Sequence, residues 1–578
     1  MNYKIATILS AKSFSQGRGA SQVMPVEEMS VPDIFQYLHD HPNDGFMFIY
    51  LDVLIAKSPD AVVEEALSRF QIKPDSVNLG VLLQTPDGRY PQVKEALNGY
   101  KEPQKLLELF SAHHNIDVRE MLVHEYHLVQ QMWDKIFRDN RENHKPLSGS
   151  FTFGIPANFI DAIRNPRQYT HVNDLVTDTQ PHSITTGTSL RTVQVEQTME
   201  RVNELPLDDI LVGDIIGFGF CGTYMTLVNW KLNLSVPFGR NMYSITGVSQ
   251  SSGKGIDKMA AAASGIMEAL ERYSAGLGCT PNFPDGFEHP PVFIKASYEK
   301  LRAEGALDPN SLSLEIPYMG HELHWVKGEA LTQSGSQEIW IPAQAVYLLP
   351  NLDEVSVCVS SSNGLASGNT LSEAKLHALL EIIERDGDYT IFYTPDRVFT
   401  LTAEDPKISD ILNRYKSRGL TVQVLDLTSE FGVPTYRAFV QTEGQIISGS
   451  GTHLDGRIAM ARAICELSPK CFVWEKKGGD WHRVINPAEG TPTRVYNQLP
   501  NYSSGNVAAD LRTMESLLIR NGYSPIYVDL TRSDIHIPVV RAIVPGLDMP
   551  MGPSERQIYH FLEQSGMKEQ VLKVVARS

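Results

Sequence analysis

The chain has few cysteines and no long apolar run. Its 578 residues include only five cysteines, and no two of them form a C-x-x-C pair, so the sequence indicates neither a zinc site nor a disulfide framework. No stretch approaches the roughly eighteen apolar residues of a membrane span. The apolar run near the N-terminus is too short for a signal peptide. We therefore expect a cytoplasmic protein that has no membrane partner.

Basic charge is also scarce. Lys and Arg total 51 against 68 Asp and Glu, which gives a formal net charge of −17 at pH 7. No cluster of basic residues offsets this balance locally, so we expect no nucleic-acid partner. The acidity does not exclude a nucleotide, because a bound metal ion can supply the positive charge. The chain also lacks the Walker spacing of a P-loop and the motifs of a hydrolase triad.

The most informative feature present is a set of three carboxylate-rich segments with helical spacing. In each segment the spacing of the polar side chains places them on one face of a helix. The members are Ser264, Glu268 and Glu271 in the first segment, Glu373, Glu381 and Glu384 in the second, and Arg462 and Glu466 in the third. The intervening residues are largely apolar, which predicts buried helices, and buried carboxylates need cations. Several of them aimed at one place would suit Mg²⁺ bound to phosphates.

Two other interpretations of these segments stay open. They could be salt-bridged surface helices, because Arg272 and Arg385 directly follow the Glu-x-x-Glu pairs and can fold back on a carboxylate. They could also hold a carboxylate-bridged metal oxidase site, with His377 four residues before Glu381, although such sites use Glu-x-x-His motifs. Two guanidinium groups are more useful beside triphosphate oxygens than beside a dinuclear metal centre.

Each carboxylate segment follows a polar, Gly-rich stretch. These stretches are residues 253–255, 364–368 and 451–456, and Lys254 adds an ammonium group to the first. We interpret them as loops that open the helices and offer backbone N–H groups to an anion. The recurrence of one loop type before three similar helices argues against the surface-helix interpretation.

The segment pattern predicts an α/β fold with α+β layers and two domains. We expect a small N-terminal α/β domain over residues 1–150, for substrate or partner recognition, a linker over 151–188, and a catalytic domain over 189–578. In the first domain, strands are predicted over 4–10, 45–56 and 78–85, and helices over 31–40, 60–70, 105–114 and 121–140. In the catalytic domain, 420–427, 444–449 and 537–544 have the pattern of strands.

These motifs, in this order, resemble the YcaO family of ATP-dependent enzymes that activate peptide backbone amides. The resemblance covers about residues 189–550. It rests on the three carboxylate segments, on the stretch from Arg191 to Arg201 before them, and on 252–255, 363–370, 451–455, 529–532 and 544–546.

The resemblance implies ATP and Mg²⁺ as cofactors and assigns residues to them. The metal ligands it implies are Glu268, Glu271, Glu373, Glu381, Glu384 and Glu466. The nucleotide contacts it implies are Lys254, Ser264, Arg272, Asn369, Arg385 and Arg462. Among these residues, Glu268, Glu384 and Arg462 are the expected catalytic ones.

The reaction implied by the resemblance is the addition of a nucleophile to a backbone carbonyl, with capture of the resulting oxyanion by ATP. Products in the family are azolines, thioamides or amidines in a ribosomal peptide or protein. The end of the chain, 571–578, lacks the Pro-x-Pro-x-Pro tail of many azoline-forming members, which weakens the expectation of an azoline and leaves thioamidation open.

The resemblance also implies partners. They are a peptide or protein substrate, a leader-peptide-binding or TfuA-like partner protein, and a second copy in a homodimer. The rival hypothesis is a non-catalytic adaptor of the same fold that presents a peptide to another enzyme. Six buried carboxylates argue against it, because their desolvation cost is large unless they bind cations.

Overall fold

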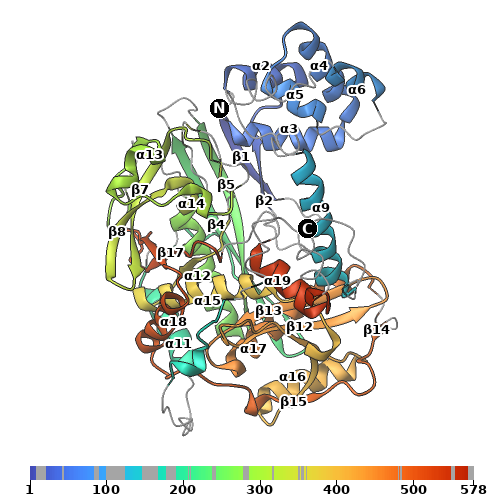
Figure 1. Ribbon diagram of the computed structural model, residues 1–578, viewed down its shortest axis with the longest axis vertical. Coiled ribbons are helices and arrows are strands. Elements are labelled where there is room, and N and C mark those ends of the chain that lie inside the picture. The colour runs from blue at the N-terminus through green and yellow to red at the C-terminus, as the bar shows by residue number, and fades with distance from the viewer. Residues whose placement is uncertain are drawn as a thin grey trace.

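The structure is a computed structural model of the chain (Figure 1). It describes residues 1–7, 21–41, 44–83, 90–98, 124–145, 167–176, 190–205, 211–236, 243–276, 286–314, 318–348, 361–479, 484–547 and 554–569, with several isolated positions between these ranges. The predicted helix over 105–114 and most of the expected linker over 151–188 lie outside the described residues. None of the helices in the described ranges is long and apolar enough to cross a membrane.

The first sheet joins the N-terminus of the chain to a long hairpin. Its strands lie in the order β2 (Ser21–Pro25), β1 (Asn2–Thr7), β5 (Tyr243–Gly255), β4 (Thr223–Val236) and β3 (Ile216–Phe220). β4 and β5 form the antiparallel hairpin, whereas β1 pairs with β5 in parallel. The helix α12 (Lys258–Gly276) packs on β4 and β5, and α11 (Leu190–Glu204) packs on α12.

The second sheet supports the third carboxylate segment. Its strand order is β13 (Ile446–Thr452), β12 (Thr435–Thr442), β11 (Gln423–Asp426), β10 (Val398–Thr402) and β15 (Thr493–Val495), and β14 (Val484–Ile485) also pairs with β12. The helix α17 (Gly456–Lys476) packs on β12 and β13, and α16 (Pro406–Ser417) shares its hydrophobic core.

The third sheet supports the second carboxylate segment. Its strand order is β6 (Ile294–Ala296), β7 (Leu323–Thr332), β16 (Ile526–Asp529), β17 (Val539–Ile543) and β9 (Leu365–Ser367), and β8 (Gly335–Pro342) also pairs with β7. The helix α15 (Leu371–Thr390) packs on β17, β9 and α18 (Val507–Arg520), and it also contacts β13 of the second sheet. The short helices α13 (Tyr298–Leu301) and α14 (Ala343–Val346) complete this part. The predicted strands over 420–427, 444–449 and 537–544 are found as β11, β13 and β17.

The N-terminal part is mainly helical. Its helices are α2 (Val31–Asp40), α3 (Gly45–Lys57), α4 (Pro59–Ile72), α5 (Ser76–Leu83) and α6 (Pro91–Asn98). The predicted helices over 31–40 and 60–70 are confirmed, but the predicted strands over 45–56 and 78–85 are wrong, because α3 and α5 occupy these residues. Since β1 and β2 extend the first sheet, these residues do not form a sheet of their own within the described ranges.

Capping explains both misassigned helices. The Asp44 carboxylate accepts hydrogen bonds from the backbone N–H groups of Phe46 and Met47, at 3.1 and 3.2 Å, and so begins α3. Asp75 and Asn78 bond reciprocally at the start of α5, each side chain accepting from the backbone N–H of the other residue. The periodicity of short apolar runs such as these does not distinguish a strand from a helix. Here the N-terminal caps favour the helix.

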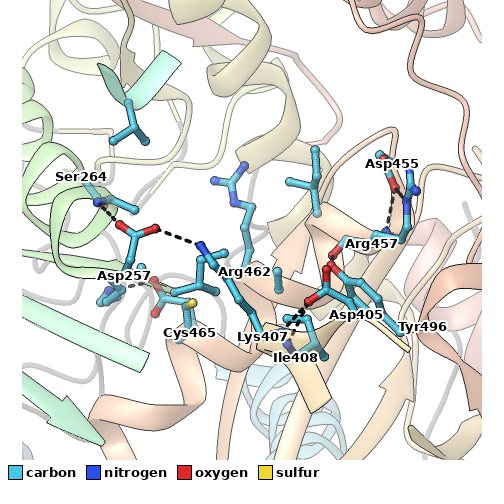
Figure 2. Close-up of a pocket in the computed structure, with 18 of the residues that line it drawn as sticks. Asp257, Ser264, Asp405, Lys407, Ile408, Asp455, Arg457, Arg462, Cys465 and Tyr496 are labelled. Atoms are coloured by element: carbon cyan, nitrogen blue, oxygen red, sulfur yellow. Dashed lines mark hydrogen bonds and ion pairs between the residues drawn. The ribbon is translucent and has the colours of Figure 1, made fainter. Parts of the chain in front are cut away.

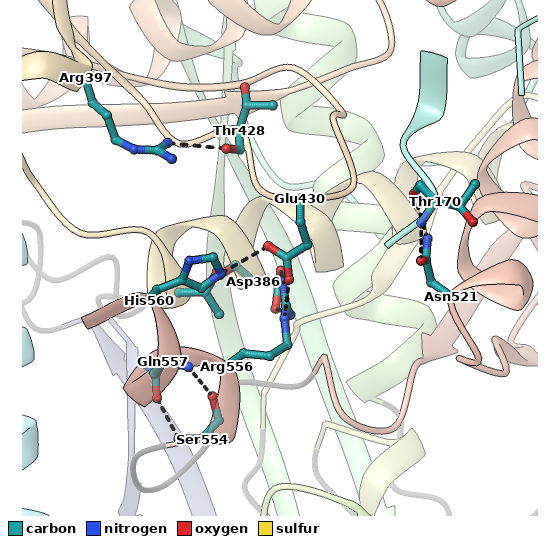
Figure 3. A network of polar contacts seen from close by, with 11 residues as sticks. Thr170, Asp386, Arg397, Thr428, Glu430, Asn521, Ser554, Arg556, Gln557 and His560 are labelled. Atoms are coloured by element: carbon teal, nitrogen blue, oxygen red, sulfur yellow. Dashed lines mark hydrogen bonds and ion pairs between the residues drawn. The ribbon is translucent and has the colours of Figure 1, made fainter. Parts of the chain in front are cut away.

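Two helices from opposite ends of the chain meet beside α15. The helix α9 (His124–Asn143), which overlaps the predicted helix over 121–140, runs from the N-terminal helices down to α19 (Glu555–Gln564) (Figure 1). Trp133 of α9 packs edge-on against Phe561 of α19, with ring centroids 5.1 Å apart. Arg556 of α19 pairs with Asp386 of α15 and with Glu430, which also contacts His560 (Figure 3). The helices α9 and α19 therefore pack together, and α19 is held to α15 by ion pairs.

Candidate active site

The three Gly-rich stretches are strand residues and strand ends on which the carboxylate helices rest. A Cβ on Gly253 of β5 would fall 2.0 Å from the carbonyl oxygen of Ala261 in α12. A Cβ on Gly451 of β13 would fall 2.3 Å from a carbonyl oxygen of α17, and one on Gly368, after β9, would fall 2.5 Å from a backbone nitrogen of α15. The prediction that these stretches are loops is therefore wrong at 253–255 and 365–367, which are strand, whereas contact with an anion stays a prediction. The glycines are needed because helix and strand backbones approach too closely for a side chain.

The helix α12 presents two carboxylates that share one guanidinium group. Nη1 of Arg272 lies 2.5 Å from Oε1 of Glu271, and Nη2 lies 3.5 Å from Oε1 of Glu268. The other oxygen of Glu268 accepts a hydrogen bond from the backbone N–H of Ser252 in β5, at 3.3 Å. The ion pairs of the surface-helix interpretation are thus present, but the side chains of Glu271 and Arg272 are only 12% and 24% exposed, so the helix face is largely buried.

The helix α15 brings its own pair of carboxylates to the same place. Nη2 of Arg385 lies 3.7 Å from Oε1 of Glu381. Glu381 is close enough to Glu271 of α12 for its charge to raise the pKa of Glu271. Arg385 is influenced by Glu381, Glu384 and, from α17, Glu466, whose charges together outweigh burial and raise its pKa. The three helices therefore form one ionic network.

The helix α17 adds a carboxylate that is paired with a lysine from the first sheet. Nζ of Lys254, in β5, lies 2.8 Å from Oε1 of Glu466. One turn further along α17, Nζ of Lys470 donates to the carbonyl of Ser448 at 2.6 Å, and burial lowers its pKa. Arg462 donates to the carbonyl of Thr452 at 3.4 Å. The sequence analysis did not single out Lys470, since an isolated lysine on a helix carries no signal.

The carboxylates of the network do not share one electrostatic environment. Burial raises the pKa of Glu271 to about 8, against the opposing charge of Arg272. Burial also raises the pKa of Glu384 to about 7, and Asp388 and Glu466 raise it further while Arg385 and Arg462 oppose them. At Glu466 burial acts in the same direction, but Lys254 and Lys470 outweigh it and lower the pKa. Two carboxyl groups are thus poorly compensated, which is the condition that a bound cation relieves.

Glu373 and Asn369 lie at the other end of α15. Glu373 accepts a hydrogen bond from the backbone N–H of Asn369 at 3.2 Å, and its own N–H donates to the hydroxyl of Thr370. Asn369 also accepts from the hydroxyl of Thr198 in α11, at 3.1 Å. Thr370 is therefore the cap of the helix and Glu373 lies in its first turn, about 12 Å along the axis from Glu381 at 1.5 Å per residue. Its predicted role as a metal ligand stays a prediction.

A pocket of about 720 Å³ opens beside the network. Of the residues expected from the sequence, its walls contain Lys254, Ser264, Glu384, Arg462 and Glu466. In Figure 2 the side chain of Arg462 lies between Asp257 and Tyr496, which line opposite sides of the pocket. The remaining expected residues lie outside the pocket wall, in the adjoining network or at the start of α15.

Polar residues to which the sequence analysis gave no role line the pocket on both sides of Arg462. Asp257 lies 3.7 Å from Nζ of Lys407, and Asp455 forms a 2.6 Å ion pair with Arg457 (Figure 2). Asp455 and Asp257 also accept backbone N–H bonds at the starts of α17 and α12, which is a common role for aspartate. Because aspartates of this kind precede many helices, their positions give no sequence signal for a pocket.

The donor set fits Mg²⁺ that is shared with phosphates. No three His, Cys, Asp or Glu side chains within the described ranges converge closely enough to hold a metal ion by themselves. Mg²⁺ commonly uses one or two carboxylates and completes its shell with water and substrate phosphates, so this is no obstacle. Of the expected metal ligands, Glu384 and Glu466 lie at the pocket wall, which also contains Glu196, Asp257, Asp405 and Asp455. Basic side chains beside them can contact the phosphates.

This pocket, with buried carboxylates on one side and basic groups among them, has the features of a site for a metal-bound polyphosphate. The chain belongs to the YcaO family, described as ATP- and Mg²⁺-binding cyclodehydratases, and the match covers residues 252–548. The family, the α/β fold class and the cofactors ATP and Mg²⁺ predicted from the sequence are thereby confirmed.

Two relatives and one solved structure illustrate the similarity. A protein of Methanothermobacter thermautotrophicus (strain Delta H), described as uncharacterized, is 32% identical over 331 residues, which are 52% of this chain and 82% of the relative. A protein from the tfuA 3′ region of Rhizobium leguminosarum bv. trifolii is 26% identical over 354 residues, 55% of this chain and 81% of the relative. A heterocyclase in complex with substrate and cofactor has a TM-score of 0.49 and 22% identity, over 61% of this chain and 52% of that structure. The chain thus spans about half the length of that heterocyclase.

Proposed function

We propose that this protein uses Mg²⁺ and ATP to phosphorylate the oxygen of a peptide backbone amide, during modification of a ribosomal peptide or protein. The observation that carries the proposal is the ionic network of carboxylates from α12, α15 and α17 with interleaved basic groups, beside a pocket whose wall includes Glu384, Glu466 and Lys254. Membership of a family described as ATP- and Mg²⁺-binding supports it.

The residues of the chain would act by position and charge. When bound, Mg²⁺ neutralises the triphosphate and draws electrons from the phosphorus that is attacked. We propose that Glu268, Glu271, Glu381, Glu384 and Glu466 hold the metal ions, with Glu373 completing the set from the start of α15. Lys254, Ser264, Arg272, Asn369, Arg385 and Arg462 would contact the nucleotide. Such catalysis needs no covalent enzyme intermediate, because fixed charges stabilise the transferring phosphoryl group.

The proposed chemistry balances in three steps. A nucleophile loses its proton to solvent and adds to the carbonyl carbon of the amide, and the oxygen keeps the electron pair of the broken π bond. That oxygen attacks the γ-phosphorus of ATP and ADP leaves. Cleavage of the C–O bond then expels inorganic phosphate, while a double bond forms from the carbon to nitrogen or to the added sulfur and the proton on that atom is lost to solvent. An azoline results when the nucleophile is a Cys, Ser or Thr side chain, and a thioamide results when it is an external sulfide.

One comparison favours the thioamide product. The relative from Rhizobium leguminosarum is encoded in the tfuA 3′ region, so a TfuA-like protein is a reasonable partner for this chain as well. We therefore propose a TfuA-like partner and sulfide as the nucleophile, with azoline formation as the alternative. Mass spectrometry of the modified peptide distinguishes the two, because an azoline has lost one water whereas a thioamide has exchanged oxygen for sulfur.

Calorimetric titration with a non-hydrolysable ATP analogue, with and without Mg²⁺, tests the nucleotide site. We expect Mg²⁺-dependent binding by the wild-type protein and its loss in Glu268→Gln and Glu384→Gln. Glu338→Gln is the matched control, since Glu338 carries the same charge on a side chain that is 74% exposed in β8. Full binding by both site variants would refute the metal assignment. No binding by the wild type would favour a non-catalytic adaptor.

The N-terminal part is proposed to recognise the peptide or the partner protein through α2–α6. Deletion of residues 1–150 is a poor test, because it would also remove β1 and β2 from the first sheet. Hydrogen exchange of the full chain with an added TfuA-like protein is better, and slower exchange in α2–α6 is the expected result. Slower exchange at the pocket alone would refute the assignment. The predicted homodimer is tested by sedimentation of the purified chain.

A further inference from the structure

The last turn of α9 forms hydrogen bonds with the backbone just beyond the end of α15. Oδ1 of Asn140 accepts from the backbone N–H of Tyr393 at 2.8 Å, and Nδ2 donates to the carbonyl of the same residue at 3.0 Å. Nδ2 also donates to the carbonyl of Lys145 at 2.9 Å. Asn140 is only 1% exposed, so these bonds replace water for backbone groups that would otherwise be buried alone. A side-chain amide that bonds both the N–H and the carbonyl of one residue holds the two peptide groups that flank that residue.

A second contact leads from α9 to the pocket wall. The carbonyl of Arg141 accepts from Nη1 of Arg437 at 3.3 Å, and Nη2 of Arg437 lies 2.8 Å from Oδ1 of Asp388 in α15. Asp388 accepts two further bonds from the hydroxyl of Ser450, at 3.0 and 3.2 Å, and Ser450 lines the pocket. Asp388 is one helical turn beyond Glu384, so this chain of contacts holds the helix segment that carries the pocket carboxylate.

His144 shows how closely the segment after α9 is docked. Its ring stacks on Tyr393 with centroids 4.0 Å apart and an interplanar angle of 6°, and it meets Phe439 edge-on at 4.7 Å. The residue has φ +50°, a conformation that is uncommon outside glycine. Both ring nitrogens are buried without a hydrogen-bond partner among the described residues. Strain and unsatisfied polar atoms persist only where the surrounding structure enforces them.

We propose that the α9 segment belongs to the framework of the catalytic centre, with Asn140 and Arg437 as positioning residues that fix the end of α15 against the pocket. This inference rests on the proposed ATP-dependent function. It gives the N-terminal part a role in catalysis that is distinct from recognition by α2–α6, because the contacts described here lead from α9 to the end of α15 through Tyr393 and Arg437.

Four full-length variants test the proposal. Asn140→Ala removes the two hydrogen bonds to the backbone of Tyr393. Asn143→Ala is the control, since Asn143 lies on the same helix but is exposed. Arg437→Met removes the charge that faces Asp388, and Arg437→Lys restores it. Two readouts are needed: the Kd of a non-hydrolysable ATP analogue with Mg²⁺, and the hydrogen exchange of residues 386–393 well below the melting temperature.

We expect Asn140→Ala to accelerate exchange in residues 386–393 and to weaken Mg²⁺-dependent binding about tenfold, whereas Asn143→Ala changes neither. Arg437→Met should weaken binding similarly, and Arg437→Lys should recover most of the loss, a rescue that general destabilisation would not produce. Faster exchange with unchanged affinity would overturn the positioning role and leave the proposed function standing. A wild-type protein that binds no nucleotide would instead refute the proposed function, and the positioning role with it.

Discussion

Replacing Glu384 by Gln should make the metal-free protein more stable, not less. Burial is the largest cause that raises the pKa of this carboxyl group from its ordinary value of 4.5 to about 7. Below pH 4.5 the group is protonated in both the folded and the unfolded chain and has no effect. As the pH rises from 4.5 to 7, the unfolded chain loses the proton while the folded chain retains it, so the native state is progressively destabilised.

The size of the effect follows from the two pKa values. Each pH unit between them is worth about 1.4 kcal/mol, so ionised Glu384 costs the native state on the order of 3 kcal/mol at pH 8. Gln has nearly the same shape and carries no charge, so it removes this cost. Destabilised metal sites of this kind are common where function requires uncompensated charge.

Urea denaturation of the wild-type protein and Glu384→Gln at two pH values measures the effect. At pH 8 the variant should have the higher urea midpoint, and its free energy of unfolding should be larger by up to about 3 kcal/mol. Near pH 4.5 the two proteins should have the same free energy of unfolding. Addition of Mg²⁺ and an ATP analogue should reverse the order at pH 8, because a ligand at about 1,000 times its Kd stabilises the wild type by about 4.1 kcal/mol and the variant much less. A variant that is less stable at pH 8, or equally shifted at both pH values, would refute this reasoning.

Three further predictions concern the surroundings of the site. Lys254→Met should weaken Mg²⁺-nucleotide binding at least tenfold by calorimetry, since it removes an ammonium group at the pocket wall that is proposed to contact the phosphates; unchanged affinity would exclude Lys254 from the site. Gly253→Ala should destabilise the protein by more than about 2 kcal/mol in urea, because the new methyl group would lie 2.0 Å from the carbonyl oxygen of Ala261; a neutral result would contradict the close packing of α12 on β5. Arg556→Met should cost about 3–5 kcal/mol by leaving Asp386 buried and unpaired, and the double variant with Asp386→Asn should recover part of that loss.

The carboxylate helices could be predicted because their signal is local. Three and four residue spacings place side chains on one helix face whatever the rest of the chain does, and α12, α15 and α17 appear where this pattern predicts them. The apolar residues between the carboxylates also indicated burial correctly. What the pattern could not supply was the partner of each charge: Lys254 and Glu466 are 212 residues apart in the sequence and lie together only because β5 and α17 are neighbours.

The glycines were misinterpreted for a physical reason of a different kind. A glycine can serve a turn, an anion or a close backbone approach, and sequence alone does not separate these uses. At Gly253 and Gly451 the third use holds, because strand and helix touch at backbone distance. The N-terminal strands were misassigned because the decisive caps, Asp44 and Asp75, are polar residues outside the apolar runs that were interpreted.

The close packing and the charge pattern have a common consequence. Glycine on β5 and β13 lets α12 and α17 lie directly on the strands, which holds their carboxylates at fixed positions beside basic groups. The network contains five carboxylates and five basic groups, namely Glu268, Glu271, Glu381, Glu384 and Glu466 with Lys254, Arg272, Arg385, Arg462 and Lys470. Such a set is close to neutral when all ten are charged. A triphosphate whose charge is balanced by Mg²⁺ is also close to neutral, so it can enter without creating a large buried charge. This accounts for how a chain of net charge −17 can accommodate a polyanion.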